Sequence, residues 1–275
     1  MAESTGKQAL AVDAINSSIA KTYDQENRGV PRLFARHISK LASPIDDSSV
    51  VHDNGCGPAV VTYELLTLLG DKPKAFRIEA TDLAPPMIAA ANEVIQANGW
   101  NNVTASVQDS TKLAFPDNAF THSFVNFLVP IRPEAFSEIY RTLKPRGEAL
   151  YTTWKTHNFS NLMHRCTSII FPRLKCTEAT RTAGLSESKL RGFFEAGGFR
   201  DEDVNVDSHK EYLYFKDMED LMSLVHGPFG KFFTNEWNEE DLARLPDAVE
   251  QALTAEERES KRLEMVAWVV RARKS

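Results

Sequence analysis

The sequence of 275 residues lacks the features that mark secreted, membrane-spanning and metal-binding proteins. Its three cysteines, Cys56, Cys166 and Cys176, are too few and too irregularly spaced for a disulfide framework or a zinc site, so we expect reduced thiols. No apolar run approaches the ~20 residues of a membrane span, and the first residues lack the charged-then-apolar layout of a signal peptide. We therefore expect a cytoplasmic protein with no metal and no membrane partner.

Clustered basic charge is also missing. The formal net charge is −6, and the Lys and Arg residues are scattered along the chain. Neutralising a phosphate backbone requires clustered basic side chains, so we expect no nucleic-acid partner and favour a small molecule. With 42% hydrophobic and 25% charged residues, the chain has enough apolar material for one substantial core, which predicts a single domain over residues 1–275.

The strongest functional signal is the segment VVHDNGCGPA, residues 50–59. An apolar strand ends there in an acid, two glycines allow a tight turn against a ligand, and a proline is placed to start a helix. Residues 50–69 contain no Lys or Arg and no P-loop spacing, which argues against a nucleoside triphosphate. Val60 stands where a dinucleotide fingerprint needs a small residue. The acid suits a cationic or amine-bearing ligand, although an ordinary strand–turn–helix connection is the alternative.

Strand and helix patterns alternate from this segment to Trp154, which favours a parallel sheet with helices on both faces. After Trp154 the pattern breaks into two aromatic, helical insertions at 156–186 and 216–261. We predict a doubly wound, mostly parallel α/β sheet of seven strands, with helical lid insertions. The expected strands are 50–51, 75–81, 103–107, 120–127, 148–154, 204–215 and 263–271, and the expected core helices are 58–69, 85–99, 133–143 and 187–197.

The order of these motifs resembles the class I S-adenosylmethionine-dependent methyltransferases. Their first loop reads roughly acid-x-Gly-x-Gly-x-Gly/Ala, which Asp53, Gly55, Gly57 and Ala59 match, and Asp82 ends the next strand. The segments 108–110, 113–118 and 143–147 follow in the order of the ubiquinone/menaquinone-biosynthesis type and of fungal secondary-metabolite methyltransferases. The resemblance is firm over about 48–155. The remainder resembles, more faintly, fungal methyltransferases that act on thiols of gliotoxin-type metabolites.

The resemblance implies a Rossmann-like fold that binds S-adenosyl-L-methionine. It places an N-terminal helical cap at 1–45, the cofactor-binding core at 48–155, and an acceptor lid in the two insertions. It also implies methyl transfer to a small-molecule acceptor, a secondary metabolite with a thiol or another readily ionised heteroatom. The alternatives are an O- or N-methyltransferase and a regulatory scaffold that binds the cofactor without turnover, with a nicotinamide oxidoreductase as a distant third. His52 departs from the usual aliphatic residue, so we expect strand one to be less buried there.

Each cofactor contact that the resemblance implies has a physical reason and a structural alternative. Asp82 can accept both ribose hydroxyls, and the glycines allow the backbone to approach the methionine portion. The structural alternative for the glycines is a tight turn, and for Asp82 it is a helix N-cap. For Asp109-Ser110 the alternative is a turn cap, and for Tyr23 it is plain packing. The predicted contacts are Tyr23 over the cofactor, Asp53, Gly55, Gly57, Ala59 and Asn126 at the methionine end, Asp82 on ribose, Leu83, Met87, Asp109 and Ser110 on adenine, and Phe127 facing the acceptor.

No residue is assigned as catalytic, because in-line methyl transfer depends mainly on alignment and exclusion of water. A general base would have to come from His157, His164 or His226, and a histidine in an insertion is more often solvated or packed. The apolar walls of the acceptor pocket are expected from aromatic and Met side chains of the insertions, with a homodimer interface as the alternative. These side chains are Phe159, Met163, Phe171, Phe229, Phe232, Phe233 and Trp237.

Overall fold

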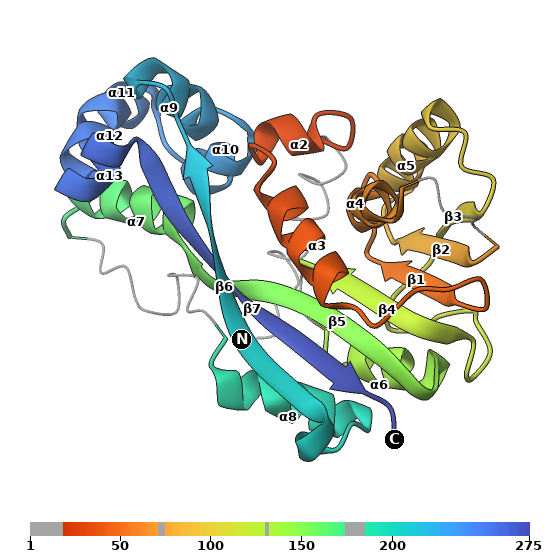
Figure 1. Ribbon diagram of the computed structural model, residues 1–275. Coiled ribbons are helices and arrows are strands. Elements are labelled where there is room, and N and C mark those ends of the chain that lie inside the picture. Colours follow the sequence, from red (N-terminus) through yellow and green to blue (C-terminus); the bar gives the residue numbers. More distant parts are fainter. Residues whose placement is uncertain (1–18, 71–74, 130–131, 174–184) are drawn as a thin grey trace.

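The computed structural model describes residues 19–70, 75–129, 132–173 and 185–275, and a seven-stranded sheet forms its centre. The order across the sheet is β3-β2-β1-β4-β5-β7-β6 (Figure 1). Neighbouring strands from β3 to β5 are parallel, and β7 is antiparallel to both β5 and β6. The predicted doubly wound sheet is confirmed. The strands are β1 (Val50–Asn54), β2 (Arg77–Asp82), β3 (Val103–Val107), β4 (Phe120–Asn126), β5 (Leu143–His157), β6 (Val204–Tyr214) and β7 (Arg262–Arg273).

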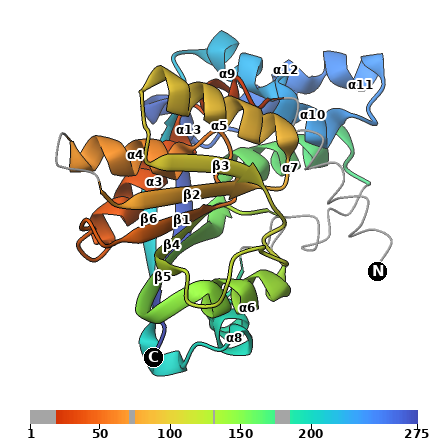
Figure 2. The same ribbon diagram turned by 90° about the vertical axis from the view of Figure 1, so that its right-hand side faces the viewer.

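Helices cover both faces of the sheet (Figure 2). On one face lie α3 (Val30–Leu41), α4 (Val60–Leu69) and α5 (Pro85–Ala97), and on the other lie α6 (Pro133–Thr142) and α8 (Glu187–Gly197). Successive strand residues point to opposite faces. In β4, Phe124 therefore packs with α3 and α4, while Val125 packs with α6 and α8.

Helix α4 begins at Val60, so the prediction that Pro58 starts it is wrong. Ala59 immediately precedes the helix and has φ +63°, a left-handed conformation that a right-handed helix does not contain. Gly55 and Gly57 also have positive φ. The chain therefore turns through residues 55–59 before the helix starts.

The expectation that strand one is less buried at His52 is also wrong, because this side chain is fully buried. Its ring stacks on Phe120 with centroids 4.6 Å apart, and its Nε2 lies 2.9 Å from Thr81 Oγ1. Aromatic stacking thus replaces the aliphatic contact expected at this position. Burial lowers the pKa of His52 to about 3.

We expect His52 to make the fold less stable in mild acid. Because its folded-state pKa lies below its ordinary 6.5, the neutral ring contributes stability that is full above pH 6.5 and is lost as the pH falls toward about 3. Asp53 acts in the opposite direction, since burial raises its pKa to about 6. Thermal unfolding at pH 7 and pH 5 should show a smaller acid-induced loss in His52→Gln than in the wild type, by up to about 2 kcal/mol. Equal losses would contradict this assignment.

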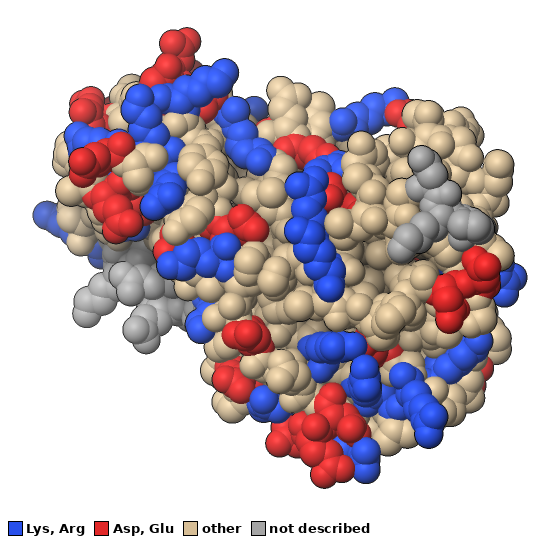
Figure 3. All heavy atoms as spheres, in the orientation of Figure 1, with Lys and Arg blue, Asp and Glu red and all other residues tan. Residues whose placement is uncertain are grey.

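A helical cap extends the molecule beyond one end of the sheet. It consists of α7 (Asn158–Ile170), α9 (Met218–Val225), α10 (Pro228–Thr234), α11 (Glu239–Ala243), α12 (Leu245–Ala252) and α13 (Ala255–Ser260). Helices α7, α9 and α12 share an apolar core with the ends of β6 and β7, built from residues such as Leu162, Leu221, Val249 and Leu263. Acidic and basic side chains alternate over its surface on the face shown in Figure 3. Between the cap and α4, Figure 1 shows the short helix α2 (Tyr23–Glu26), within the predicted N-terminal cap.

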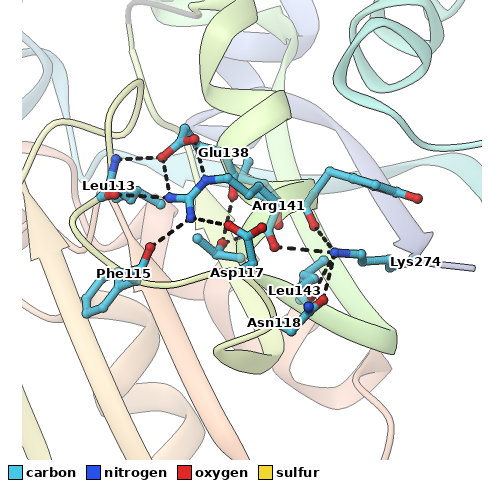
Figure 4. A network of polar contacts seen from close by, with 11 residues as sticks. Leu113, Phe115, Asp117, Asn118, Glu138, Arg141, Leu143 and Lys274 are labelled. Atoms are coloured by element: carbon cyan, nitrogen blue, oxygen red, sulfur yellow. Dashed lines mark hydrogen bonds and ion pairs between the residues drawn. The ribbon is translucent and has the colours of Figure 1, made fainter.

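A polar network fixes the segment between β3 and β4 to α6 (Figure 4). Arg141 donates to the carbonyls of Leu113 and Phe115 at 3.1 and 2.8 Å and to Glu138 at 2.7 Å. Lys274 donates to the carbonyl of Leu143 at 2.8 Å, where β5 begins ahead of the predicted start. The network therefore fixes the middle of the segment 108–119, whose first residues include Asp109 and Ser110.

Candidate active site

The glycine loop is fixed against the end of β2 by backbone hydrogen bonds. The amides of Gly55 and Cys56 both donate to the carbonyl of Thr81 at 2.8 Å. A Cβ at Gly55 would lie 2.6 Å from Leu128 Cδ1, whereas a Cβ at Gly57 would meet nothing within 4 Å. Gly55 is therefore required both by its positive φ and by the side chain packed against it.

A cavity of about 290 Å³, here called the loop cavity, opens beside this loop at the carboxyl ends of the parallel strands. β1 lies between β2 and β4 in the sheet, so the strand order reverses there, at the point where open α/β sheets bind ligands. Most of the predicted cofactor contacts line the loop cavity: Tyr23, Gly55, Gly57, Asp82, Leu83, Met87, Asp109, Ser110, Asn126 and Phe127. Ala84, Pro85, Leu128, Val129 and Arg132 complete the lining.

Asp82 joins the glycine loop to the start of α5. One carboxylate oxygen accepts from the amide of Gly57 and the other from the amide of Ala84, each at 2.9 Å. A carboxylate oxygen has two lone pairs, so these bonds leave capacity to accept from a ligand hydroxyl. Asp82 therefore organises the loop and also presents its carboxylate to the loop cavity.

Asp53 and Ala59 do not line the loop cavity. Asp53 is 1% exposed, and its Oδ2 accepts from the Thr62 amide at 3.0 Å and from the Thr62 hydroxyl at 2.7 Å. Burial raises its pKa to about 6. Its Oδ1 is buried without a hydrogen-bond partner among the described residues. The Asp53 side chain is thus not placed to contact a ligand in the loop cavity directly. Ala59 packs against Cys56 and Ala80 beneath the loop.

Asp109 forms the turn cap that was the structural alternative for it, and it also lines the loop cavity. Its Oδ1 accepts from the amide and hydroxyl of Thr111 at 2.9 and 2.8 Å, and these bonds lower its pKa. Its Oδ2 lies 3.7 Å from Arg132 Nη1. Arg132 is a lining residue that the sequence analysis missed, because it belongs to no motif.

The end of β4 is held by side-chain hydrogen bonds. Asn126 donates to the carbonyl of Pro31 at 3.1 Å and accepts from the hydroxyl of Thr152 at 2.8 Å. Phe127 has φ +57°, which is strained for a residue with a side chain and is characteristic of functional sites. The Phe127 ring stacks on Trp154 at a centroid distance of 3.9 Å.

The chemistry of the loop cavity fits an adenosine-containing, positively charged ligand. Leu83 and Val129, which line the loop cavity, are 44% and 39% exposed, so their apolar surface is open to a ligand. They supply apolar walls beside the carboxylates of Asp82 and Asp109. The buried, unpartnered Oδ1 of Asp53 adds negative character beneath the loop.

A second cavity of about 120 Å³, here called the cap cavity, lies between α2, α3 and the helical cap. Tyr23, Phe127 and Val129 line both cavities, so the two adjoin at these residues. The other residues of the cap cavity are Glu26, Asn27, Val30, Pro31, Trp154, His157, Phe159, Leu213, Leu224, Phe229 and Met265.

Only part of the aromatic wall predicted from the insertions lines the cap cavity. Phe159 and Phe229 do, whereas the remaining predicted wall residues do not. Met163 is fully buried in the apolar core of the helical cap, and Phe171, Phe233 and Trp237 pack against that core. Phe232 lies edge-to-face against Phe233, with centroids 5.5 Å apart.

His157 is the one of the three candidate histidines that lines the cap cavity. Its Nδ1 accepts from the amide of Ser160 at 3.2 Å and so caps α7. Burial lowers its pKa to about 4. At neutral pH the ring is therefore uncharged, with its hydrogen on Nε2, which makes that atom a donor rather than a base. His164 lies edge-to-face against Phe233, and His226 follows α9.

Other kinds of site find no support in the described ranges. They contain no group of three or more His, Cys, Asp or Glu residues arranged to hold a metal ion. Within the same ranges no helix combines the length and the apolar character of a membrane span. Cys56 and Cys166 are free thiols, and Cys176 lies outside the described residues.

A Rossmann-like sheet with a cavity at its switch point is the arrangement in which open α/β folds bind nucleotide cofactors. Residues 51–147 match the family of the methyltransferase domain. The chain is 25% identical to the methyltransferase tpcH of Aspergillus fumigatus, over 82% of this chain and 86% of that protein. It is 24% identical to an acetylaranotin bis-thiomethyltransferase of Aspergillus terreus, over 74% of each chain.

The fold is also similar to that of a solved methyltransferase. A Haemonchus contortus phosphoethanolamine N-methyltransferase 2, solved with S-adenosyl-L-methionine, superimposes with a TM-score of 0.53 at 16% identity, over 88% of this chain and 52% of that one. Residues 51–147 are thus a methyltransferase domain, and these relatives support S-adenosylmethionine-dependent methyl transfer as the activity and S-adenosylmethionine as the cofactor. The predicted activity and cofactor are thereby confirmed.

Proposed function

We propose that the loop cavity holds S-adenosylmethionine with its ribose on Asp82 and its adenine between Leu83 and Met87. Asp109 and the amide of Ser110 would meet the adenine edge, and the glycine loop and the end of β4 would meet the methionine portion. The location of these residues around one cavity supports this assignment. Asp53 would act on the ammonium group only through a bridging water, because its side chain is covered.

We propose further that the cap cavity holds a small-molecule acceptor, a secondary metabolite with a thiol or another readily ionised heteroatom. The observation that carries this proposal is the apolar, aromatic cap cavity that adjoins the loop cavity at Tyr23, Phe127 and Val129. Apolar walls with a few polar groups are usual for small-molecule sites. The similarity to a bis-thiomethyltransferase over 74% of the chain supports sulfur as the acceptor atom.

When bound, S-adenosylmethionine supplies an electrophilic methyl group on a sulfonium sulfur. The protein's own contribution is alignment and exclusion of water, which account for much of the rate of such displacements. Phe127, Trp154 and Phe159 would hold the acceptor in line with the loop cavity. Neutral His157 would donate a hydrogen bond and would not take the acceptor's proton.

The test is a labelled-methyl transfer assay with the purified protein against thiol, phenol, amine and carboxyl acceptors of similar size. Transfer to thiols at rates well above those to the phenols and carboxylates is the expected result. Preferred transfer to a phenol or alcohol would replace sulfur by oxygen as the acceptor atom. Tight binding of S-adenosylhomocysteine without transfer to any acceptor would contradict the proposed acceptor class.

We predict that His157→Gln, His164→Gln and His226→Gln each retain most of the wild-type turnover number. The reason is that a thiol is partly ionised near neutral pH, and His157 has no free lone pair on Nε2. Loss of a general base typically costs about 100-fold or more. A drop of that size in any variant, with cofactor affinity intact by calorimetry, would show that the mechanism needs a base.

A further inference from the structure

The cap cavity contains one carboxylate that the sequence analysis did not single out. Glu26, at the end of α2, lines the cavity together with mainly apolar side chains such as Trp154, Phe159 and Phe229. Among the described residues that line it, no other is acidic and none is Lys or Arg. Glu26 therefore dominates the electrostatics of the cap cavity.

The Glu26 carboxylate has no partner in the described part of the chain: no hydrogen bond or ion pair involves its side chain. Arg28, two residues further along, instead donates to Asp220 on α9 at 2.8 Å. Gly227, just before α10, leaves room for the carboxylate, since a Cβ there would lie 3.1 Å from Glu26 Oε2. The carboxylate is thus packed at the wall of the cavity without being neutralised by the protein.

An acceptor that fills the cap cavity removes water from this carboxylate. Desolvating an unpaired charge is costly, so an acceptor that is apolar beside the Glu26 carboxylate binds more weakly. An acceptor with a positive or N–H group there gains a charge-assisted hydrogen bond instead. Tyr23 lies three residues before Glu26 and lines both cavities. Glu26 lines the cap cavity and not the loop cavity, so it lies on the cap-cavity side of the point where the two adjoin.

We propose that Glu26 is a specificity-determining residue that selects acceptors carrying an ammonium or other N–H group in addition to the methyl-accepting atom. The proposal rests on the proposed function of the cap cavity as the acceptor site. His157, the neutral donor on the same cavity, complements Glu26 by binding an acceptor oxygen or sulfur.

The experiment compares two probes of similar shape, 3-(aminomethyl)thiophenol and 3-ethylthiophenol, which differ by an ammonium group in place of a methyl group. Their affinities for the protein saturated with S-adenosylhomocysteine are measured by calorimetry. We expect the wild type to bind the aminomethyl probe at least about tenfold more tightly, and Glu26→Gln to reduce this preference to about twofold or less. Glu195→Gln removes an exposed carboxylate on α8 and should keep the full preference.

An unchanged affinity for S-adenosylhomocysteine shows that Glu26→Gln is folded. Equal affinity of the wild type for the two probes, or a preference that persists in Glu26→Gln, would overturn the assignment of Glu26. Methyl transfer to the same probes tests the proposed function separately. If the preference in binding is found but no methyl group is transferred to sulfur, the thiol acceptor is wrong and the role of Glu26 in selection stands.

Discussion

Replacing Asp82 with alanine is expected to weaken the binding of S-adenosylmethionine at least tenfold. The substitution removes the charge-assisted hydrogen bonds that we propose to the ribose, and bonds of this kind contribute about 1.5 to 3 kcal/mol each. It also removes the acceptor for the Gly57 amide, so the glycine loop loses one of its three hydrogen bonds to the end of β2 and keeps those of Gly55 and Cys56 to Thr81. Titration calorimetry with S-adenosylmethionine and S-adenosylhomocysteine measures the effect directly.

Asp46 offers a matched control, because its carboxylate also accepts from a nearby backbone amide, that of Ser48 at 2.9 Å, but lies in an exposed turn. Asp46→Ala should leave cofactor affinity unchanged. Asp82→Asn keeps one carbonyl oxygen and should fall between the wild type and alanine. Near-normal affinity in a folded Asp82→Ala protein would mean that Asp82 serves only to organise the loop and α5.

The parallel core could be predicted from the sequence because its signals are local. β3 has the predicted bounds, and α8 spans the predicted 187–197. The residues of the loop cavity follow from the same regularity, since strand ends meet at one edge of a parallel sheet. Asp82, Asp109 and Asn126 each stand at or just after a strand end and line one cavity.

The errors arise where backbone conformation or three-dimensional packing overrides the local pattern. Pro58 is a common first residue of a helix, yet the left-handed Ala59 delays α4. Asp53 has the position of a ligand contact in the motif, but its side chain turns beneath the loop to Thr62, so only the contact through a bridging water remains proposed for it. In the helical cap, aromatic residues serve both the apolar core and the cavity, and composition alone does not separate them. Glu26 belongs to no motif, and only the fold brings α2 to the cap cavity.

This ambiguity leads to the second large expected effect, in which two phenylalanines of the same helix behave differently. Phe229→Ala should raise the Michaelis constant for the acceptor by roughly 30-fold, because burying an aromatic wall against the acceptor contributes about 2 kcal/mol. Phe229 lines the cap cavity and not the loop cavity, so the affinity for S-adenosylmethionine should stay unchanged. Steady-state kinetics with a thiol acceptor and calorimetry with the cofactor separate the two quantities.

Phe233 is the matched control, one turn further along α10. It packs edge-to-face on His164 at 5.2 Å and against the apolar core of the helical cap, away from the cap cavity. Phe233→Ala should therefore lower the free energy of unfolding by about 3 kcal/mol, the lower end of the range for loss of a packed phenylalanine, while the acceptor's Michaelis constant changes little. If the two variants raise the Michaelis constant equally, the aromatic surface of the cap acts as a unit and the cap cavity alone does not define the acceptor site. If Phe229→Ala instead weakens acceptor and cofactor binding together, the cap and α2 are coupled through Tyr23, which lines both cavities.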